Sequence, residues 1–133
     1  MIVFLRGFFI GVVVSMLAVT SWAGSQCPLF AIPREVYAHP WFIATLADAY
    51  WGFATFFVWV CFKENSPLAR VAWFLAIMLL GNIAMAAYGL NEAFRTPRDG
   101  RVEDILLTRR DGVGALGLIL AAIGMALIAA ALA

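Results

Sequence analysis

The chain has 133 residues, of which 65% are hydrophobic and 13% are charged, with nine Lys/Arg against eight Asp/Glu. An ordinary soluble domain is about 45–50% apolar and about 25% charged, so this composition excludes that class and predicts an integral protein of the lipid bilayer. The nearly balanced charge gives no indication of nucleic-acid binding, which needs a basic surface facing the phosphates.

Four apolar runs follow one another along the chain, separated by short polar segments. A helix needs about 20 residues, at about 1.5 Å each, to cross a hydrocarbon core about 30 Å thick. The runs predict helices at about 2–23, 41–62, 71–90 and 113–132. The expected fold class is therefore all-α: a four-transmembrane-helix bundle that forms one integral membrane domain over residues 1–133.

The first run has features of a secretory signal, because Ser21-Trp22-Ala23 precedes Gly24 as at a cleavage site. Arg6 is the single positive charge ahead of the apolar centre, which is weak for a signal peptide. We therefore expect a retained N-terminal helix rather than a cleaved signal. The expected location is a membrane crossed several times, the inner membrane if the source is bacterial.

The second and third runs are expected to form an antiparallel central hairpin. Pro40 opens the second helix at a position where its missing N–H does no harm, and Pro67 lies in the short connection 63–70. Asp111 is placed to cap the fourth helix. Before it, residues 102–107 are expected to form a short helix on the membrane surface.

The orientation in the membrane stays open at this stage. The expected topology places the arginine-rich loops 24–40 and 91–112 on one side, and Arg6, Lys63 and Arg70 on the other. Cytoplasmic loops carry an excess of Lys and Arg, which favours a cytoplasmic location for the two loops. Arg6 ahead of the first span favours a cytoplasmic N-terminus instead, and a dual-topology dimer is a further option.

Asp48 is the most informative residue, because it lies inside the second apolar run. Helical spacing of about 100° per residue places a polar and aromatic stripe around it. With Asn82 of the third helix, this stripe gives the ligand-binding or proton-linked candidates: Asp48, Asn82, Trp51, Thr45, Thr55 and Gly52. We expect Asp48 and Asn82 to meet across the hairpin, either as a clamp contributing about 0.5–2 kcal/mol or as a functional site.

Small residues at helical spacing predict close helix packing in the first and fourth helices. Such residues let two backbones approach closely in a membrane. The residues are Gly7, Gly11 and Ser15 in the first helix, and Gly117, Ala121 and Gly124 in the fourth. These faces are expected to pack either with each other or with another chain, which is a membrane-protein partner or a second copy.

Four residues are expected at the level of the lipid headgroups. His39 and Trp41 lie at the start of the second helix, and Arg109 and Arg110 are expected to extend toward lipid phosphates. His39 has no Cys, Glu or second His at ligand spacing, so no metal site is predicted. Cys27 and Cys61 fall at opposite ends of the expected bundle, which is too far apart for a disulfide.

Catalytic signatures are absent from the sequence, which has neither a nucleophile elbow, nor a metal-binding His-Glu pair, nor a phosphate-cradling glycine loop. No catalytic residue and no cofactor is therefore assigned. An enzyme would have to work from Asp48, Tyr50 and the aromatic residues.

The central part of the chain contains a set of motif residues: His39-Pro40-Trp41, Ala44-Thr45-Leu46, Asp48, Tyr50, Trp59-Val60, Lys63-Glu64, Trp73, Gly81-Asn82 and Tyr88. In these residues the chain resembles a small membrane-protein family of unknown function shared by bacteria and land plants. The resemblance covers positions 37–90 well, the first helix loosely and the fourth hardly at all. It implies no activity, and it implies that position 82 takes a small polar residue, often Ser.

Two hypotheses of different class follow, with a third behind them. The first is an accessory or assembly subunit of a larger membrane complex. The alternative is a small carrier or binding protein, perhaps dimeric, that uses Asp48 to hold a proton, a cation or an apolar ligand. The further alternative is a small lipid-modifying membrane enzyme.

Overall fold

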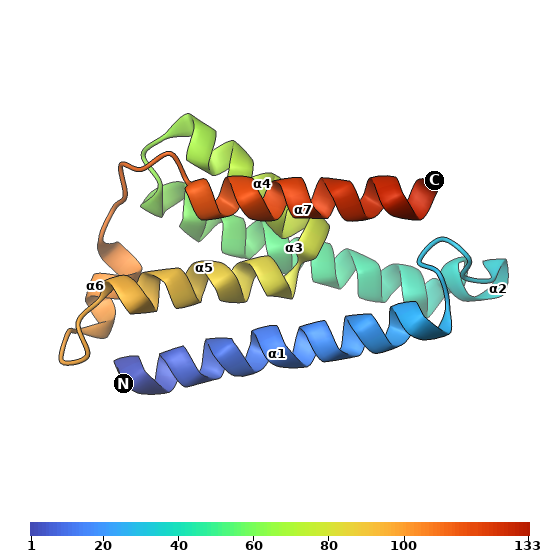
Figure 1. Ribbon diagram of the computed structural model, residues 1–133, viewed down its shortest axis with the longest axis horizontal. Helices are drawn as coiled ribbons and strands as arrows, with labels where there is room; N and C mark the ends of the chain where they lie inside the picture. Colours follow the sequence, from blue (N-terminus) through green and yellow to red (C-terminus); the bar gives the residue numbers. More distant parts are fainter.

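The computed structural model describes residues 1–133, and the chain is all-helical with no β-strand (Figure 1). His39 caps the second long helix by accepting the N–H of Trp41 at its Nδ1 (3.3 Å), and Ser66 caps the next helix through Ala69. The elements are α1 Ile2–Gln26, α2 Arg34–Tyr37, α3 Pro40–Lys63, α4 Pro67–Leu80, α5 Asn82–Arg95, α6 Val102–Leu107 and α7 Ala115–Leu132.

Three of these helices, α1, α3 and α7, are long and apolar enough to cross a membrane. Helices α4 and α5 have 14 residues each. At about 1.5 Å per residue each is about 21 Å long, shorter than a hydrocarbon core of about 30 Å.

The expected third helix over 71–90 is divided at Gly81, and this is the main correction to the sequence-based topology. Gly81 has φ 54° and ψ −126°, a left-handed region that glycine adopts without the penalty of a Cβ. A Cβ at Gly81 would also lie 2.7 Å from the ring of Phe53. Helix α5 turns back beside α4 instead of continuing it (Figure 1). Hydropathy alone does not register this reversal, because both halves of the run are apolar.

The reversal brings the segment 96–114 to the end of the molecule that also holds the N-terminus and the turn 64–66 (Figure 1). We call this the charged end. It carries eight of the nine basic residues: Arg6, Lys63, Arg70, Arg95, Arg98, Arg101, Arg109 and Arg110. Only Arg34 lies at the opposite end. The expectation that loops 24–40 and 91–112 share one side is therefore wrong.

The helices pack in two pairs, α1 along α5 and α4 along α7. Phe9 of α1 lies against Gly89 of α5, and Trp73 of α4 lies against Gly117 of α7. The larger core cluster is formed by Val60, Trp73, Ala76, Ile77, Ala84, Tyr88 and Ala121. A smaller cluster of Ile2, Ala93 and Ile105 closes the charged end.

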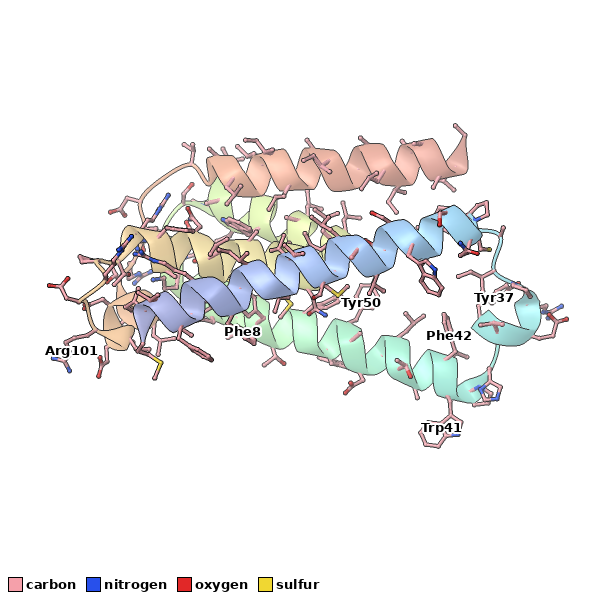
Figure 2. The ribbon with its side chains drawn as sticks, turned by 60° about the horizontal axis from the view of Figure 1, so that its bottom comes forward. Phe8, Tyr37, Trp41, Phe42, Tyr50 and Arg101 are labelled. Carbon is pink, nitrogen blue, oxygen red and sulfur yellow. The ribbon has the colours of Figure 1, made fainter.

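The opposite half of α1 and α3 is built without a core. We call residues 10–52 the distal half, and none of them is buried; indeed no residue from 3 to 59 is. Figure 2 shows α1 and α3 separating toward the α2 end, with Trp41 pointing away from the molecule. The short α4–α5 hairpin stops before this region, so no third element fills the space between the two helices.

The connection from α5 to α7 follows the sequence-based expectation in one part and departs from it in another. The short helix expected over 102–107 is present as α6. Asp111 does not cap α7, because this helix begins only at Ala115. The residue before it, Gly114, has a positive φ of 69°. The Asp111 carboxylate instead accepts a hydrogen bond from the side-chain amide of Asn65 (2.5 Å).

Candidate functional site: a buried ion cluster and the cavity beside it

Glu92 lies at the centre of the charged end and its side chain is fully buried. Lys63 Nζ of α3 lies 2.6 Å from its Oε2. Arg110 donates through Nε to both carboxylate oxygens, at 3.0 and 3.1 Å, and its Nη2 lies 3.0 Å from Oε2. We call Lys63, Glu92 and Arg110 the ion cluster. Arg95, one turn along α5, is a looser fourth member at 4.0 Å.

The ion cluster also fixes the backbone of the connections around it. Lys63 Nζ donates to the carbonyl of Ile105 in α6. The backbone N–H of Arg110 donates to the carbonyl of Lys63 (2.7 Å), and the N–H of Asn65 donates back to the carbonyl of Arg110 (2.8 Å). The end of α3, helix α6 and the approach to α7 are thereby joined around one carboxylate.

A second buried contact joins Tyr88 of α5 to Glu64, the residue that follows α3. The Tyr88 hydroxyl donates to Glu64 Oε1 at 3.0 Å. The Tyr88 ring meets Phe56, Trp59 and Trp73 edge-on, with ring centroids 4.8–6.1 Å apart, an arrangement that aromatic rings favour. Burial raises the pKa of the Glu64 carboxyl, partly offset by the hydrogen bond from Tyr88.

Arg6 joins the start of α1 to the end of α5. Its Nε donates to the carbonyl of Ala93 (3.1 Å) and its Nη2 to the carbonyl of Thr96 (2.7 Å). The guanidinium also lies 4.9 Å from the ring centroid of Phe94. The last carbonyls of a helix lack partners within it, and a cation is favoured there.

The ion cluster joins α3, α5, α6 and the segment before α7 through ion pairs and hydrogen bonds. Every buried side-chain nitrogen and oxygen in the chain has a hydrogen-bond partner. Glu92 and Lys63 are completely enclosed, so neither is exposed to act as an acid, a base or a nucleophile.

A cavity of about 240 Å³ opens beside the ion cluster, between α4, the end of α5 and the start of α7. Arg95, Arg110, Asn91 and Glu64 supply its polar lining. Trp73, Val113 and Leu116 supply apolar lining. The cavity thus combines two guanidinium groups with an apolar surface.

The expected contact between Asp48 and Asn82 is not formed. Both residues are exposed and no hydrogen bond joins them, because the reversal at Gly81 makes Asn82 the first residue of a returning helix. Thr45 and Thr55 donate their hydroxyls to carbonyls of their own helix, those of Trp41 and Trp51 (both 2.8 Å). Trp51 and Gly52 are also exposed on α3.

Of the four residues expected at headgroup level, two lie together at the distal end. His39 and Trp41 line a shallow hollow of about 410 Å³ with Glu35, Phe42 and Thr45. Figure 2 shows Phe42 turned toward the space between α3 and α1, on the opposite side from Trp41.

The other two residues expected at headgroup level, Arg109 and Arg110, have different surroundings. Arg109 is exposed, with its guanidinium 5.7 Å from the ring centroid of Phe62. Arg110 does not reach outward as expected, because its side chain, 19% exposed, is bound to Glu92.

The two small-residue stripes have different surroundings. Gly117, Ala121 and Gly124 are buried, and the two glycines face Trp73 and Leu79 of α4. Gly7, Gly11 and Ser15 are exposed, with open space around both glycines. Both cysteines are free, and no group of three or more His, Cys, Asp or Glu side chains is placed to hold a metal ion.

Glu92, Lys63, Glu64 and Tyr88 lie close together at the charged end, and the sequence pattern did not predict this group. A third helix that ends at residue 90 places Glu92 in a loop. Two signals were available: Gly81-Asn82 is a pair typical of a tight turn, and Tyr88 and Glu92 are spaced by four, as residues on one helix face are.

Comparison with known proteins gives a family and no activity. Neither a curated protein nor a solved structure matches the chain. One family model matches residues 3–130, which is nearly the whole chain. The match therefore includes α1 and α7, whereas the motif residues named from the sequence lie in the central part. The chain therefore belongs to the family described as "Protein of unknown function (DUF1475)".

Proposed function

We propose that this chain is a multi-pass membrane protein that serves as an accessory or assembly subunit, binding another membrane protein through its distal half. In this proposal α1, α3 and α7 cross the bilayer and the charged end lies in the cytoplasm. Lys and Arg are enriched in cytoplasmic segments, and eight of the nine lie at that end. The α4–α5 hairpin then enters from the cytoplasmic side and turns back at Gly81.

The observation that carries the proposal is the position of Asp48. It lies fifteen residues before Lys63 on α3, about 22 Å from the charged end by helical rise. It is exposed in a region without a buried residue and receives no hydrogen bond from another helix. A charged residue inside the hydrocarbon core is costly, up to about 2.5–3.5 kcal/mol at the helix centre on insertion scales. Because lipid tails offer no hydrogen-bond donor, the carboxyl needs a donor from another chain.

Charge complementarity favours a particular partner, a transmembrane helix with a cation or an amide at the depth of Asp48. A second copy of this chain would bring an identical carboxyl to a symmetric contact, which disfavours the ionised pair. Gly52 lies one turn from Asp48, and nothing is within 4 Å of the position its Cβ would take. A glycine there lets a partner backbone approach α3 closely.

Docking is favoured over a carrier because Asp48 lines neither the cavity beside the ion cluster nor the hollow at His39 and Trp41. A carrier that used Asp48 would enclose its ligand beside that carboxyl. A lipid-modifying enzyme would need an acid and a base that its substrate can reach. The ion cluster does not offer such a pair, because Glu92 and Lys63 are fully buried and bonded to each other.

The test is the mass and composition of the tagged protein extracted from its own membrane in mild detergent. Asp48→Leu removes the polar group without weakening insertion, and Asp48→Asn keeps a hydrogen-bonding side chain. Asp99→Asn, at an exposed loop acid, is the matched control. We expect the wild type and Asp99→Asn to be recovered with a second protein. The amount of this second protein should fall at least tenfold with Asp48→Leu and by a smaller factor with Asp48→Asn.

Helical content and melting of each variant by circular dichroism separate lost binding from lost folding. Two outcomes contradict the proposal: recovery of the wild type alone or only with its own copies, and full retention of the partner by Asp48→Leu.

A further inference from the structure

The cavity beside the ion cluster has the size of a small polar group rather than of a large ligand. Its volume is about 240 Å³, the share of about eight waters at about 30 Å³ each. Pockets for drug-sized ligands measure about 300–1,000 Å³. The cavity therefore has room for a lipid headgroup or a small ion with its water.

The charges around the cavity leave an excess of positive charge. Glu92 is matched by Lys63 and Arg110 together, so the ion cluster alone has one cation more than it has anions. Arg95 adds a guanidinium that is 51% exposed and only loosely paired, at 4.0 Å. Glu64 is the remaining acid in the lining, and burial favours its neutral form by raising its pKa.

The donors in the lining suit an oxyanion. Asn91 contributes a side-chain amide, and Arg95 contributes a planar guanidinium of the kind that pairs with phosphate in a bidentate manner. Ala115 and Leu116 lie in the first turn of α7, where backbone N–H groups have no partner within the helix and no side chain caps them.

The other wall of the cavity is apolar and continues onto the outer surface of the bundle. Trp73 forms part of it, with Val113 and Leu116 at the start of α7. Val113 is 60% exposed and Leu116 is 36% exposed. In the orientation proposed above, this surface lies where α7 enters the bilayer, so a molecule in the cavity contacts water at one end and lipid at the other.

We propose that this cavity binds a phosphate group, and that the phosphate belongs to an anionic phospholipid whose chains lie along α7. Arg95 is the main contact, because Arg110 is already occupied by Glu92. The lipid assignment rests on the membrane location proposed above, whereas the phosphate site itself does not depend on docking of a partner through Asp48.

The test is thermal unfolding of the purified full chain in a zwitterionic detergent. The probes are phosphatidylglycerol, phosphatidylcholine and inorganic phosphate. We expect phosphatidylglycerol to raise the melting temperature of the wild type and phosphatidylcholine to leave it unchanged. Arg95→Gln is expected to need at least tenfold more phosphatidylglycerol for the same rise, with Arg95→Lys between the two.

Arg98→Gln is the matched control, since Arg98 is an exposed arginine three residues away that does not line the cavity. It should respond as the wild type does. A rise with inorganic phosphate alone, lost in Arg95→Gln, would support the phosphate site and overturn its assignment to a lipid. The same rise with phosphatidylglycerol in wild type and Arg95→Gln would overturn the proposal altogether.

Discussion

Glu92 and Asp48 are both carboxylates on helices of this chain, and their surroundings are opposite. Glu92 is fully buried and bonded to two cations at the charged end. Asp48 is exposed in the distal half and bonded to no other helix. At the charged end α1, α3, α5, α6 and the loop before α7 are joined by hydrogen bonds, whereas the distal half buries no residue.

This difference separates what holds the fold together from what is left for a partner. The charged end satisfies its own polar groups, so its residues are expected to control stability. The distal half leaves Asp48 without a donor, so its residues are expected to control assembly. Substitutions in the two regions should therefore change different measurements.

The largest effect on stability is expected from Glu92→Gln. Removing this charge leaves Lys63 and Arg110 without their counter-ion in a buried site, and breaking a buried ion pair costs about 3–5 kcal/mol. Thermal unfolding in detergent should show a large decrease in the melting temperature of this variant. The control is Glu103→Gln, because the Glu103 carboxylate is exposed and pairs only with Arg101. Equal stability of the two variants would contradict the structural role of the ion cluster.

A smaller loss is expected from Gly81→Ala, which acts on the turn between α4 and α5. A Cβ here meets the Phe53 ring and an unfavourable backbone region, and such strain costs about 1–3 kcal/mol. Gly7→Ala is the matched control, because Gly7 is helical with open space around it. Alanine there should be neutral or stabilising by about 0.5–1 kcal/mol. Equal melting temperatures for Gly81→Ala and wild type would argue against a sharp turn at Gly81.

The smallest effect concerns the pH dependence set by Glu64. Its folded-state pKa is raised above the ordinary value of 4.5, so the folded state binds the proton more tightly than the unfolded state. The contribution of Glu64 to stability is therefore fully present below pH 4.5, and it declines as the pH rises through the raised pKa of the folded state. Glu92, Arg95 and Lys63 also act on this carboxyl. Melting temperatures measured between pH 4 and 8 should show this decline reduced in Glu64→Gln. An unchanged decline would assign it to another group.

Much of the helical framework is predictable from local sequence. The apolar runs gave α1, α3 and α7 to within a few residues at most ends, and Pro40 and Lys63 mark the observed limits of α3. Membership of a family of unknown function was expected from the central residues, and the family model confirms it. These features depend on composition and on signals at helix ends, which act over a few residues.

The candidate site was not predictable in the same way, because it depends on where the chain reverses. A run of twenty apolar residues over 71–90 is equally compatible with one span and with two shorter antiparallel helices. Once Gly81 turns the chain, Glu92 meets Lys63 and Arg110, residues 29 and 18 positions away in the sequence. The same reversal makes Asn82 the first residue of a returning helix, where it forms no hydrogen bond with Asp48.

The most direct test of this arrangement is the side of the membrane on which two single cysteines are labelled. Cys27 lies at the distal end and is exposed, and it becomes the single thiol in a Cys61→Ser variant. The second protein carries Asp99→Cys at the charged end and has both native cysteines replaced by serine. A membrane-impermeant maleimide is applied to intact cells before and after permeabilisation.

We expect Cys27 to react in intact cells and the cysteine at position 99 to react only after permeabilisation, because the turn at Gly81 places them on opposite sides. Reaction of both positions from the same side would contradict the turn and restore a third helix that crosses the membrane.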